Sequence, residues 1–506
     1  MGAKSAGTAR HIEVEQKFDV PGSTVFPSFE GICSVARVER FPSQSLDAVY
    51  FDTSGHDLAR HRTTLRRRTG GADAGWHLKL PAGADARTEV HAPLGGGADA
   101  DGAEVPADLV DIVLAIVRDR PLVPVARIAT TRSVVKLYAA DDTELVEFAD
   151  DEVSASAMNP DGSPGAEQHW HEWELELADG ARDGGAELLK RLGNRLLDAG
   201  AQPAGHGSKL AKVLADGQVT KAEWPEPPSD PVHRAVAEQV AELVEWDRAV
   251  RADVYDSVHQ MRVITRKIRS LLQASEDAFG LTDDAWILDE LRQLAGVLGA
   301  ARDAEVLAER YQRALDLLPP ELVRGPVRER LVDGANRRYQ AGLRRSLTAM
   351  RSPRYFRLLD ALEALVTAEP PEPAPGEDHA PVSIVSAYKR VRKAAKAAEQ
   401  AVEEHKDEAL HRIRKGAKRL RYVAAATGEP KVSERAKVIQ TLLGDHQDSV
   451  VSRTHLSQQA EIAHTAGEDT FTYGLLYQQE DDLAWRSRDQ LDDALSALRR
   501  SVRKAR

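Results

Sequence analysis

The chain carries the same short basic pattern twice, which constrains it to a duplicated helical unit. The first copy is VHQMRVITRKIRSLL, headed by His259, and the second is LHRIRKGAKRLRYVA, headed by His411. In each copy basic residues follow the His at the third, seventh, eighth and tenth positions. On an α-helix the His and the third, seventh and tenth positions fall within an arc of about 80°, so each predicted helix carries a basic stripe on one face. Two such helices predict an internally repeated helical domain.

A second repeated pattern follows each stripe. LGAARDAE, which begins at Leu298, corresponds to LGDHQDSV, which begins at Leu443, and the spacing from Leu to Asp is the same in both. One basic stripe alone could be an ordinary solvated face. Because the layout recurs, we interpret the two stripes as a shared site for a polyanion, with the role of the His residues less secure than that of the arginines. The candidate anion-binding residues are His259, Arg262, Arg266, Lys267, Arg269, His411, Arg414, Lys415, Lys418, Arg419 and Arg421.

Composition limits what this anion can be. The chain has a net charge of −12, and aromatic residues make up 5% of it. Its cations are concentrated locally against an acidic background, unlike the diffuse basic charge of proteins that coat nucleic acid. Tyr422 is the single aromatic residue within the stripes, so stacking platforms for exposed bases are missing. A ligand made mainly of phosphates fits better, and nucleic acid is not an expected partner.

Two proline-rich segments divide the chain. AEWPEPPSDP at 222–231 separates a half with short β-like segments from a half with long Ala-, Leu- and Arg-rich helical segments. AEPPEPAPGEDHAP at 368–381 falls between the two copies of the repeat. A chain of 506 residues has room for two domains with sizeable cores. We predict a β-rich domain over 1–218, a linker over 219–231, and a helical domain over 232–506 with halves 232–367 and 382–506.

Cysteine use and hydropathy indicate the compartment. Cys33 is the single cysteine, which excludes an internal disulfide and suits a reducing environment. The opening MGAKSAGTARHIEVE lacks the apolar region of a signal peptide, and no run of about 18 apolar residues could cross a bilayer. We expect a cytoplasmic protein with no membrane partner.

Carboxylates alternate along two of the predicted strands. In HIEVEQKF they are joined by Lys17, and on a strand such alternate side chains project from one face. Charges on one face of a strand are costly if buried without partners, so we expect this face to be polar. Carboxylate oxygens suit Mg²⁺, Mn²⁺ or Ca²⁺, and the segments offer no Cys or His cluster that zinc would prefer. The carboxylates are Glu13, Glu15, Glu172, Glu174 and Glu176.

Basic residues follow along further predicted strands. An antiparallel sheet with one solvated face would account for any single strand. For five or six strands that each carry charge, a closed barrel with a polar interior is the more economical prediction. Metal-binding carboxylates together with cations that neutralise phosphates are the parts that phosphoryl transfer requires. The candidate phosphate ligands are Arg66, Arg68, Lys79, Arg87, Arg127, Arg132 and Lys209.

The β-rich half resembles a CYTH domain. This is the triphosphate tunnel metalloenzyme fold shared by thiamine triphosphatases, class IV adenylate cyclases and inorganic tripolyphosphatases. Its signature E-x-E-x-K corresponds to Glu13, Glu15 and Lys17. Further matching motifs are YFDT (50–53), LRRR (65–68), HLKL (77–80), ELEL (174–177) and SK (208–209). In the acidic segment VEFADDEV either Asp150 or Asp151 could face inward, and parity with Glu147 favours Asp151.

The helical half resembles a CHAD domain, a conserved-histidine α-helical module associated with inorganic polyphosphate. The resemblance rests on the two His-headed basic segments and on LGAARD and LGDHQD. One departure is Gln447, which stands where the first copy has Arg302. The two resemblances together imply two domains, an antiparallel β-barrel tunnel of the α+β class followed by an all-α helical bundle with an internal two-fold repeat.

The resemblance implies a mechanism and a substrate. A linear triphosphate would thread the barrel, with Lys17 near the terminal phosphoryl group and one or two Mg²⁺ or Mn²⁺ ions bridging phosphate oxygens and activating water. The implied metal ligands are Glu13, Glu15, Asp151, Glu172, Glu174 and Glu176, and the implied catalytic residues are Glu13, Glu15 and Lys17. We therefore predict hydrolysis of inorganic tripolyphosphate or short polyphosphate, with inorganic polyphosphate bound by the helical domain and association with polyphosphate granules. The alternatives are a non-catalytic polyphosphate-binding protein, or an organic triphosphatase or adenylate cyclase.

Overall fold

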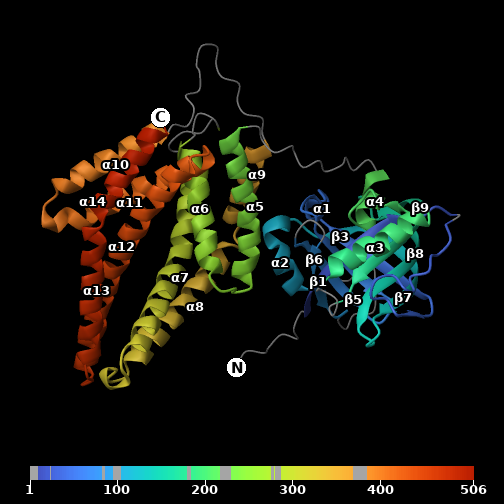
Figure 1. Ribbon diagram of the computed structural model, residues 1–506, viewed down its shortest axis with the longest axis horizontal. Helices are drawn as coiled ribbons and strands as arrows, with labels where there is room; N and C mark the ends of the chain where they lie inside the picture. The colour runs from blue at the N-terminus through green and yellow to red at the C-terminus, as the bar shows by residue number, and fades with distance from the viewer. Residues whose placement is uncertain are drawn as a thin grey trace, which may run out of the picture. The chain divides into compact units, whose positions relative to one another are not determined.

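A computed structural model of the chain describes residues 9–22, 24–82, 86–94, 104–178, 184–216, 230–274, 279, 286–367 and 384–505. The chain forms two compact units, Met1–Trp224 and Pro225–Arg506 (Figure 1). Most of the predicted linker 219–231 and the whole proline-rich segment 368–381 lie outside the described residues. The predicted domain boundaries therefore stay predictions.

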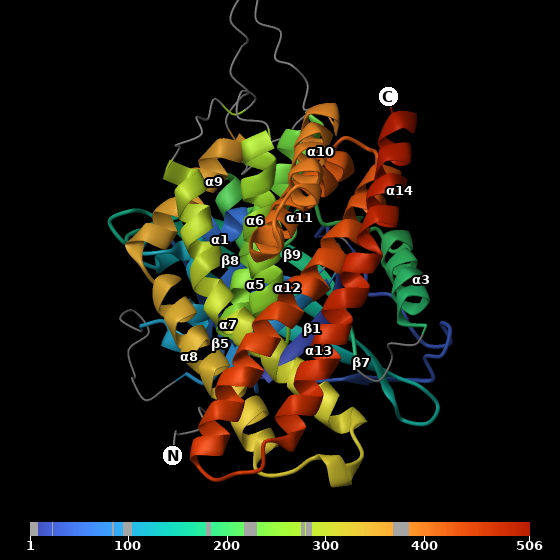
Figure 2. The ribbon, with the colours of Figure 1, turned by 90° about the vertical axis from the view of Figure 1, so that its left-hand side faces the viewer.

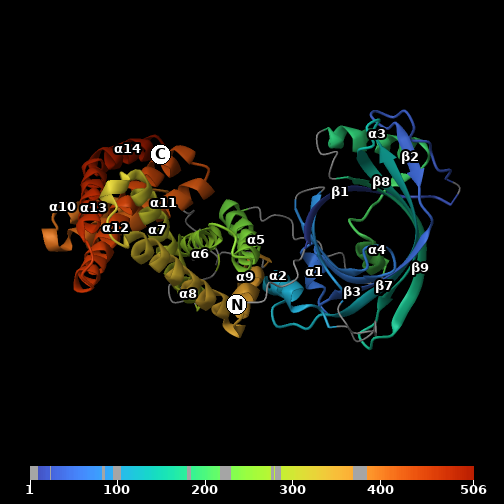
Figure 3. The same cartoon turned by 90° about the horizontal axis from the view of Figure 1, so that it is seen from below.

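The first unit is built around an antiparallel sheet. Its strands are β1 (Ala9–Asp19), β2 (Arg37–Arg40), β3 (Gln44–Asp52), β4 (Thr64–Thr69), β5 (Gly75–Pro81), β6 (Ala86–Ala92), β7 (Val123–Tyr138), β8 (Glu144–Met158), β9 (Pro164–Leu177) and β10 (Gln202–Pro203). They are ordered β10-β1-β6-β5-β4-β3-β7-β8-β9, and β1 also pairs with β9. This last pairing closes the sheet into a barrel, and Figure 3 looks into the ring of strands.

Register fixes which side chains enter the barrel. Glu15 lies opposite Glu176, and Lys17 lies opposite Glu174. Directly paired residues of an antiparallel ladder share one face of the sheet, so these four side chains point into the barrel together. Charged residues alternate with apolar ones that pack outside, as the sequence predicted. Phe18, between the charged positions, is 5% exposed in a core formed with α3.

Helices cover and plug the barrel. They are α1 (Asp57–Arg60), α2 (Ala107–Val117), α3 (Gly185–Asp198) and α4 (Lys209–Asp216). Leu210, Val213 and Leu214 of α4 pack against Ile128 and Val153, which lie on the inner faces of β7 and β8. Because apolar side chains of α4 take up the inner surface there, α4 fills that end of the barrel and starts with Lys209 directed at the charged interior.

The second unit is entirely helical among its described residues. Its first half contains α5 (Pro231–Arg251), α6 (Ser257–Ala274), α7 (Trp286–Leu317), α8 (Gly334–Ala349) and α9 (Pro353–Thr367), with a 3₁₀ turn at Pro320–Leu322 and a π-helical turn at Glu329–Asp333. Its second half contains α10 (Ile384–Glu399), α11 (Glu403–Ala426), α12 (Pro430–Thr465), α13 (Phe471–Asp489) and α14 (Leu491–Lys504).

The two halves repeat one arrangement. In each, the helix that carries a basic segment, α6 or α11, is followed by a long helix, α7 or α12, that packs against it. Figure 2 shows α12 and α13 lying side by side, as α7 and α8 do in the first half. The fold predicted from the sequence, an antiparallel β-barrel followed by an all-α repeated bundle, is confirmed. No helix among the described residues is both long and apolar enough to span a membrane.

Candidate functional site

The barrel encloses a charged cavity of about 570 Å³. All eight strands of the closed ring contribute side chains to it, and α4 contributes Lys209. The predicted site residues that line it are Glu13, Glu15, Lys17, Arg66, Arg68, Lys79, Arg87, Arg132, Glu174, Glu176 and Lys209. Closure of the sheet thus brings together side chains that are far apart in the sequence.

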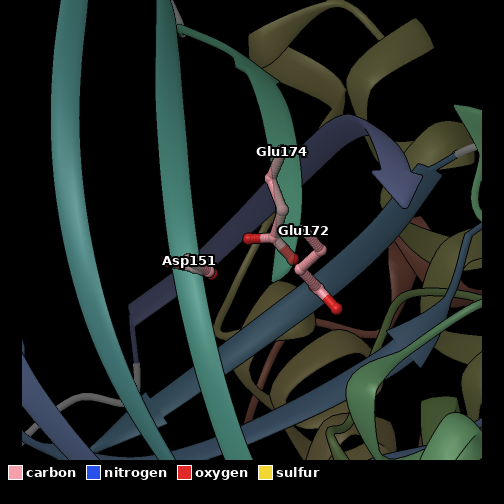
Figure 4. A group of neighbouring side chains, drawn as sticks. All are labelled: Asp151, Glu172 and Glu174. Atoms are coloured by element: carbon pink, nitrogen blue, oxygen red, sulfur yellow. The ribbon is translucent and has the colours of Figure 1, made fainter. Parts of the chain in front are cut away.

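Three carboxylates gather at the inner end of this cavity. Oxygens of Asp151, Glu172 and Glu174 lie within 4.8 Å of one another, on neighbouring strands β8 and β9 (Figure 4). Asp151 and Glu172 are 0% and 1% exposed, so they lie behind the cavity surface. Lys209, which lines the cavity, forms ion pairs with all three carboxylates. Its Nζ lies 2.9 Å from Asp151 Oδ2, 2.6 Å from Glu172 Oε1 and 2.9 Å from Glu174 Oε1. We call Asp151, Glu172 and Glu174 the inner acidic cluster.

The inner acidic cluster fits a hard divalent cation. Its donors are all carboxylate oxygens, the ligand type of Mg²⁺ and Mn²⁺. Glu172 Oε1 is buried and accepts no well-aligned hydrogen bond, although the Lys209 ammonium lies close to it. A positive charge already occupies the centre of the cluster, because Lys209 is held there. A metal ion that bound to all three carboxylates would have to displace this ammonium group.

Lys17, on β1, forms ion pairs with a carboxylate of its own strand and with one of β9. Its Nζ is 2.6 Å from Glu15 Oε2 and 2.6 Å from Glu174 Oε1. Burial alone would lower the pKa of Lys17, but Glu174 and Glu15 raise it above its ordinary value. Burial alone would raise the pKa of Glu174, but Lys17, Lys209 and Arg132 hold it well below its ordinary value. Both groups are therefore charged at neutral pH, and Lys17 is a fixed cation rather than a base.

A second group of carboxylates lies further along β1 and β9. Lys79 Nζ is 2.5 Å from Glu13 Oε2, whereas Glu176 makes no ion pair among the described residues. Burial, followed by repulsion from Glu13 and Glu15, raises the pKa of Glu176 to about 7. A divalent cation beside Glu176 would remove this repulsion, so these carboxylates also suit a metal.

Arginines of the cavity wall lie beside the carboxylates and beside one another. Arg132 donates to Asp151 Oδ2 at 2.6 Å and to Glu174 Oε2 at 2.7 Å. Arg68 contacts Asp73, and burial together with Arg66 and Arg132 lowers the pKa of Arg68 to about 10. Cations this close repel one another, so an anion between them would be stabilised.

The structure corrects one predicted phosphate ligand. Arg127 is exposed on the outer face of β7, where its Nη2 lies 2.7 Å from Asp47 Oδ2. Side chains alternate along a strand, so Arg127 and Arg132 point to opposite faces. Asp151 rather than Asp150 faces inward, as parity indicated, while Asp150 accepts a hydrogen bond from Trp173 Nε1 at 2.9 Å.

Several polar residues of the cavity or its wall were not among the predicted site residues, including Tyr50, His77 and Glu89. Tyr50 accepts a hydrogen bond from Arg66 Nη1 at 3.3 Å, and burial opposed by Arg66 leaves its pKa lowered. His77 Nδ1 lies 2.8 Å from Glu89 Oε1, and burial lowers the pKa of His77 to about 4. Spacing could have identified His77 and Glu89, because His77 lies two positions before Lys79 and Glu89 lies two positions after Arg87.

In the helical unit the two basic stripes meet, because α6 packs against α11. Burial, followed by repulsion from Arg266, Arg414, Arg262 and Arg421, lowers the pKa of Lys418 to about 6. Burial, followed by Arg262 and Arg414, lowers the pKa of Arg266 to about 10. Residues from both copies thus form one half-buried cationic cluster, and we call Arg262, Arg266, Arg414, Lys418 and Arg421 the stripe cluster.

Two glycines of the repeated LG motifs make room for the stripes. A Cβ added to Gly299 would lie 3.4 Å from Arg262 Nε, and one added to Gly444 would lie 3.3 Å from Arg414 Nη2. Each stripe arginine therefore lies against the glycine of the following helix in its own half. This equivalence gives the recurrence of the LG motif a physical reason.

Other predicted anion ligands lie away from the cluster or at its edge. Arg269 donates from Nε to the Leu288 carbonyl at 3.2 Å, and Arg419 donates to the Gln273 carbonyl. Lys267 interacts with Glu242 and Glu238, and Lys415 is exposed. The two histidines lie beside the cluster. Burial and then Arg302 lower the pKa of His259, while burial and then Lys415 lower that of His411.

Comparison with known proteins agrees with this architecture. The CYTH domain matches residues 11–200, and the CHAD domain matches residues 234–457. Two uncharacterized proteins of Mycobacterium tuberculosis, from strains CDC 1551 / Oshkosh and H37Rv, are each 66% identical over 522 aligned residues, covering 100% of this chain and 100% of the relative.

Two solved structures are also similar. PptA from Streptomyces chartreusis is 20% identical, with a TM-score of 0.45 over 53% of this chain and 99% of that one. The CHAD domain from the plant Ricinus communis is 22% identical, with a TM-score of 0.38 over 54% of this chain and 90% of that one. On the domain matches and the full-length relatives, the chain belongs to the family of proteins in which a CYTH domain is followed by a CHAD domain.

Proposed function

We propose that the barrel unit is a metal-dependent triphosphatase that hydrolyses inorganic tripolyphosphate or short polyphosphate. One observation carries this proposal: carboxylates of two neighbouring strands converge beside a cavity that is also lined by Arg and Lys side chains. Carboxylates that hold a metal beside cations that hold phosphates are the arrangement that phosphoryl transfer needs.

Each part of the cavity has a chemical task in this proposal. Arg66, Arg68 and Arg132 bind phosphate oxygens and neutralise charge that develops during transfer. Lys17, kept charged by its two carboxylate partners, stabilises the phosphoryl group that is attacked. The inner acidic cluster, or Glu13, Glu15 and Glu176, would hold Mg²⁺ or Mn²⁺, which would supply Lewis acidity and activate water.

The charge of the cavity favours bare phosphate chains over nucleotides. Its walls are lined mainly by Arg, Lys and Glu, and Tyr50 is the one aromatic side chain among the described lining residues. Sites for organic molecules of nucleotide size are usually lined mostly by apolar side chains. A base would gain little in this interior, whereas each phosphate would find cations.

We propose that the helical unit binds inorganic polyphosphate through the stripe cluster. The cluster collects cations from both halves, and burial together with their mutual repulsion lowers the pKa of Lys418 to about 6. A polyanion lying between α6 and α11 would relieve that repulsion, and its binding would release counterions. Tyr422 is the one aromatic residue of the two stripes, so bases would find little surface on which to stack and polyphosphate fits better than nucleic acid.

The test is phosphate release by the purified full chain. Tripolyphosphate, ATP and thiamine triphosphate are each supplied with Mg²⁺, Mn²⁺ or EDTA. The proposal expects metal-dependent hydrolysis with tripolyphosphate preferred. Absence of hydrolysis of any of the three would favour a protein that only binds polyphosphate, and formation of cyclic AMP from ATP at a comparable rate would favour a cyclase.

A further inference from the structure

A second cavity, of about 420 Å³, lies on the outer side of β1. Gln16 and Phe18 contribute to it from β1 and point away from the barrel interior, towards α3. Helix α3 contributes Lys190, Asn194 and Leu197. This part of the cavity therefore lies between the barrel wall and the helix that covers it.

The two cavities share part of their walls. Glu15, Lys17 and Arg87 line both of them. Arg87 Nη2 donates to the Gly207 carbonyl at 2.6 Å, and its Nε lies 4.0 Å from Glu15 Oε1. Helix α4 fills the barrel beyond Lys209, and the second cavity adjoins the tunnel at the shared wall.

The second cavity is cationic. Arg62, in the turn between α1 and β4, and Lys190, on α3, are exposed at its edge and have no ion pair among the residues that the structure describes. His206 and the Asn194 amide add possible donors. Glu15 is the acidic residue among the described lining residues, and it already pairs with Lys17 at 2.6 Å. The net charge of the described lining residues is therefore positive, which favours binding of an anion.

We infer that this cavity holds the phosphate units of a linear polyphosphate that extend beyond the tunnel, so that chains longer than three phosphates are substrates. The inference rests on the proposed hydrolysis and names its substrate class. The volume of the cavity lies in the range of sites for whole small molecules, more than one phosphate group needs. In this proposal a linear anion passes from one cavity to the other beside Arg87, which lines both.

The experiment narrows the second cavity without touching the tunnel. Asn194→Trp places a bulky side chain at an exposed position of α3 that lines the cavity, so the fold should tolerate it. Asp198→Trp, one turn later on α3, is the matched control because Asp198 is exposed and does not line the cavity. Purified full-length proteins are assayed with tripolyphosphate and with a linear polyphosphate several times longer.

Asn194→Trp should lower kcat/KM for the longer chain by about tenfold or more and leave tripolyphosphate within about twofold. Asp198→Trp should change neither value. Lys190→Ala should raise KM for the longer chain alone, because it removes a cation without filling space. If Asn194→Trp leaves the longer chain unchanged, or lowers both substrates equally, the inference is overturned.

Wild-type activity separates this inference from the proposed function. Wild-type protein that hydrolyses tripolyphosphate but not the longer chain would contradict the inference alone. Wild-type protein that hydrolyses neither would contradict the proposed function, and the inference would be lost with it.

Discussion

Lys209 Nζ lies 2.6 Å from Glu172 Oε1, at the point where the helix that plugs the barrel meets the carboxylates of β9. The same ammonium group contacts Asp151 and Glu174, so one side chain neutralises the whole inner acidic cluster. Burial alone would lower the pKa of Lys209, but Glu174, Asp151 and Glu172 raise it above its ordinary value. A metal ion would compete with this lysine for the carboxylates.

Asp151→Asn should abolish most metal-dependent hydrolysis, by about a hundredfold or more, because it removes one charge from the inner acidic cluster. The measurement is phosphate release from tripolyphosphate across a range of Mg²⁺ and Mn²⁺ concentrations. Glu152→Gln is the matched control, since Glu152 follows on the same strand but is exposed on the outer face. Equal activity of both variants would show that Asp151 has no part in the reaction.

Tripolyphosphate should be preferred to ATP by about tenfold or more in kcat/KM, because the cavity offers cations to phosphates and little apolar surface to a base. The comparison uses one protein preparation under one metal concentration. A specificity constant for ATP as high as that for tripolyphosphate would show that the cavity accommodates a nucleoside.

Arg262→Glu and Arg414→Glu together should weaken binding of long-chain polyphosphate far more than the loss of surface ion pairs would, each of which is worth about 0–1 kcal/mol. Both arginines belong to the stripe cluster, so one polyanion contacts both. Affinity of the wild-type full chain should also fall steeply with salt. Arg412→Glu, on the same helix but exposed and paired with Glu408, is the control. Tighter binding of double-stranded DNA than of polyphosphate would contradict this assignment.

Binding of polyphosphate should weaken as pH rises above about 6. In the free protein burial and neighbouring arginines lower the pKa of Lys418 to about 6, so its amine is largely neutral at pH 8. A bound polyanion favours the charged form, and binding therefore takes up a proton. The affinity should fall by up to about tenfold per pH unit above that value. Lys418→Arg, which stays charged, should flatten the profile, and an unchanged slope in this variant would exclude Lys418 as the source.

Two helical glycines should respond oppositely to alanine. A Cβ at Gly342 of α8 would lie 2.7 Å from Ala301 Cα, so Gly342→Ala should lower the free energy of unfolding by about 1–3 kcal/mol. A Cβ at Gly296 of α7 would meet nothing within 4 Å, so Gly296→Ala should raise it by about 0.5–1 kcal/mol. Chemical denaturation measures both, and destabilisation by Gly296→Ala would contradict the described packing of α7.

Period-two alternation predicted much of the barrel site, because inward positions of a strand follow from parity. Glu13, Glu15 and Lys17 all line the cavity, as their spacing indicated. The prediction for Arg127 was wrong because it was grouped with Arg132 although the two differ in parity. The contacts of Lys209 could not be predicted, since they depend on how α4 enters the barrel rather than on spacing within a strand.

Helical periodicity was equally informative for the stripes. The third, seventh and tenth positions of both copies share a face, and Arg262, Arg266, Arg414 and Lys418 do meet. Arg269 is an exception, because it lies at the tenth position but donates to the Leu288 carbonyl away from the cluster. Lys267 lies at the eighth position, on the other side of the His, and interacts with acidic residues of α5. The sequence could not predict that the two stripes face each other, because this depends on the packing of α6 against α11.

Phosphate release from tripolyphosphate by the full chain decides whether the barrel unit is a metal-dependent triphosphatase. Wild-type protein and Asp151→Asn are compared with Mg²⁺, with Mn²⁺ and with EDTA. We expect hydrolysis by the wild type with either metal, loss of hydrolysis in EDTA, and loss in Asp151→Asn. Hydrolysis that persists in EDTA, or no hydrolysis by the wild type with any metal, would contradict this assignment.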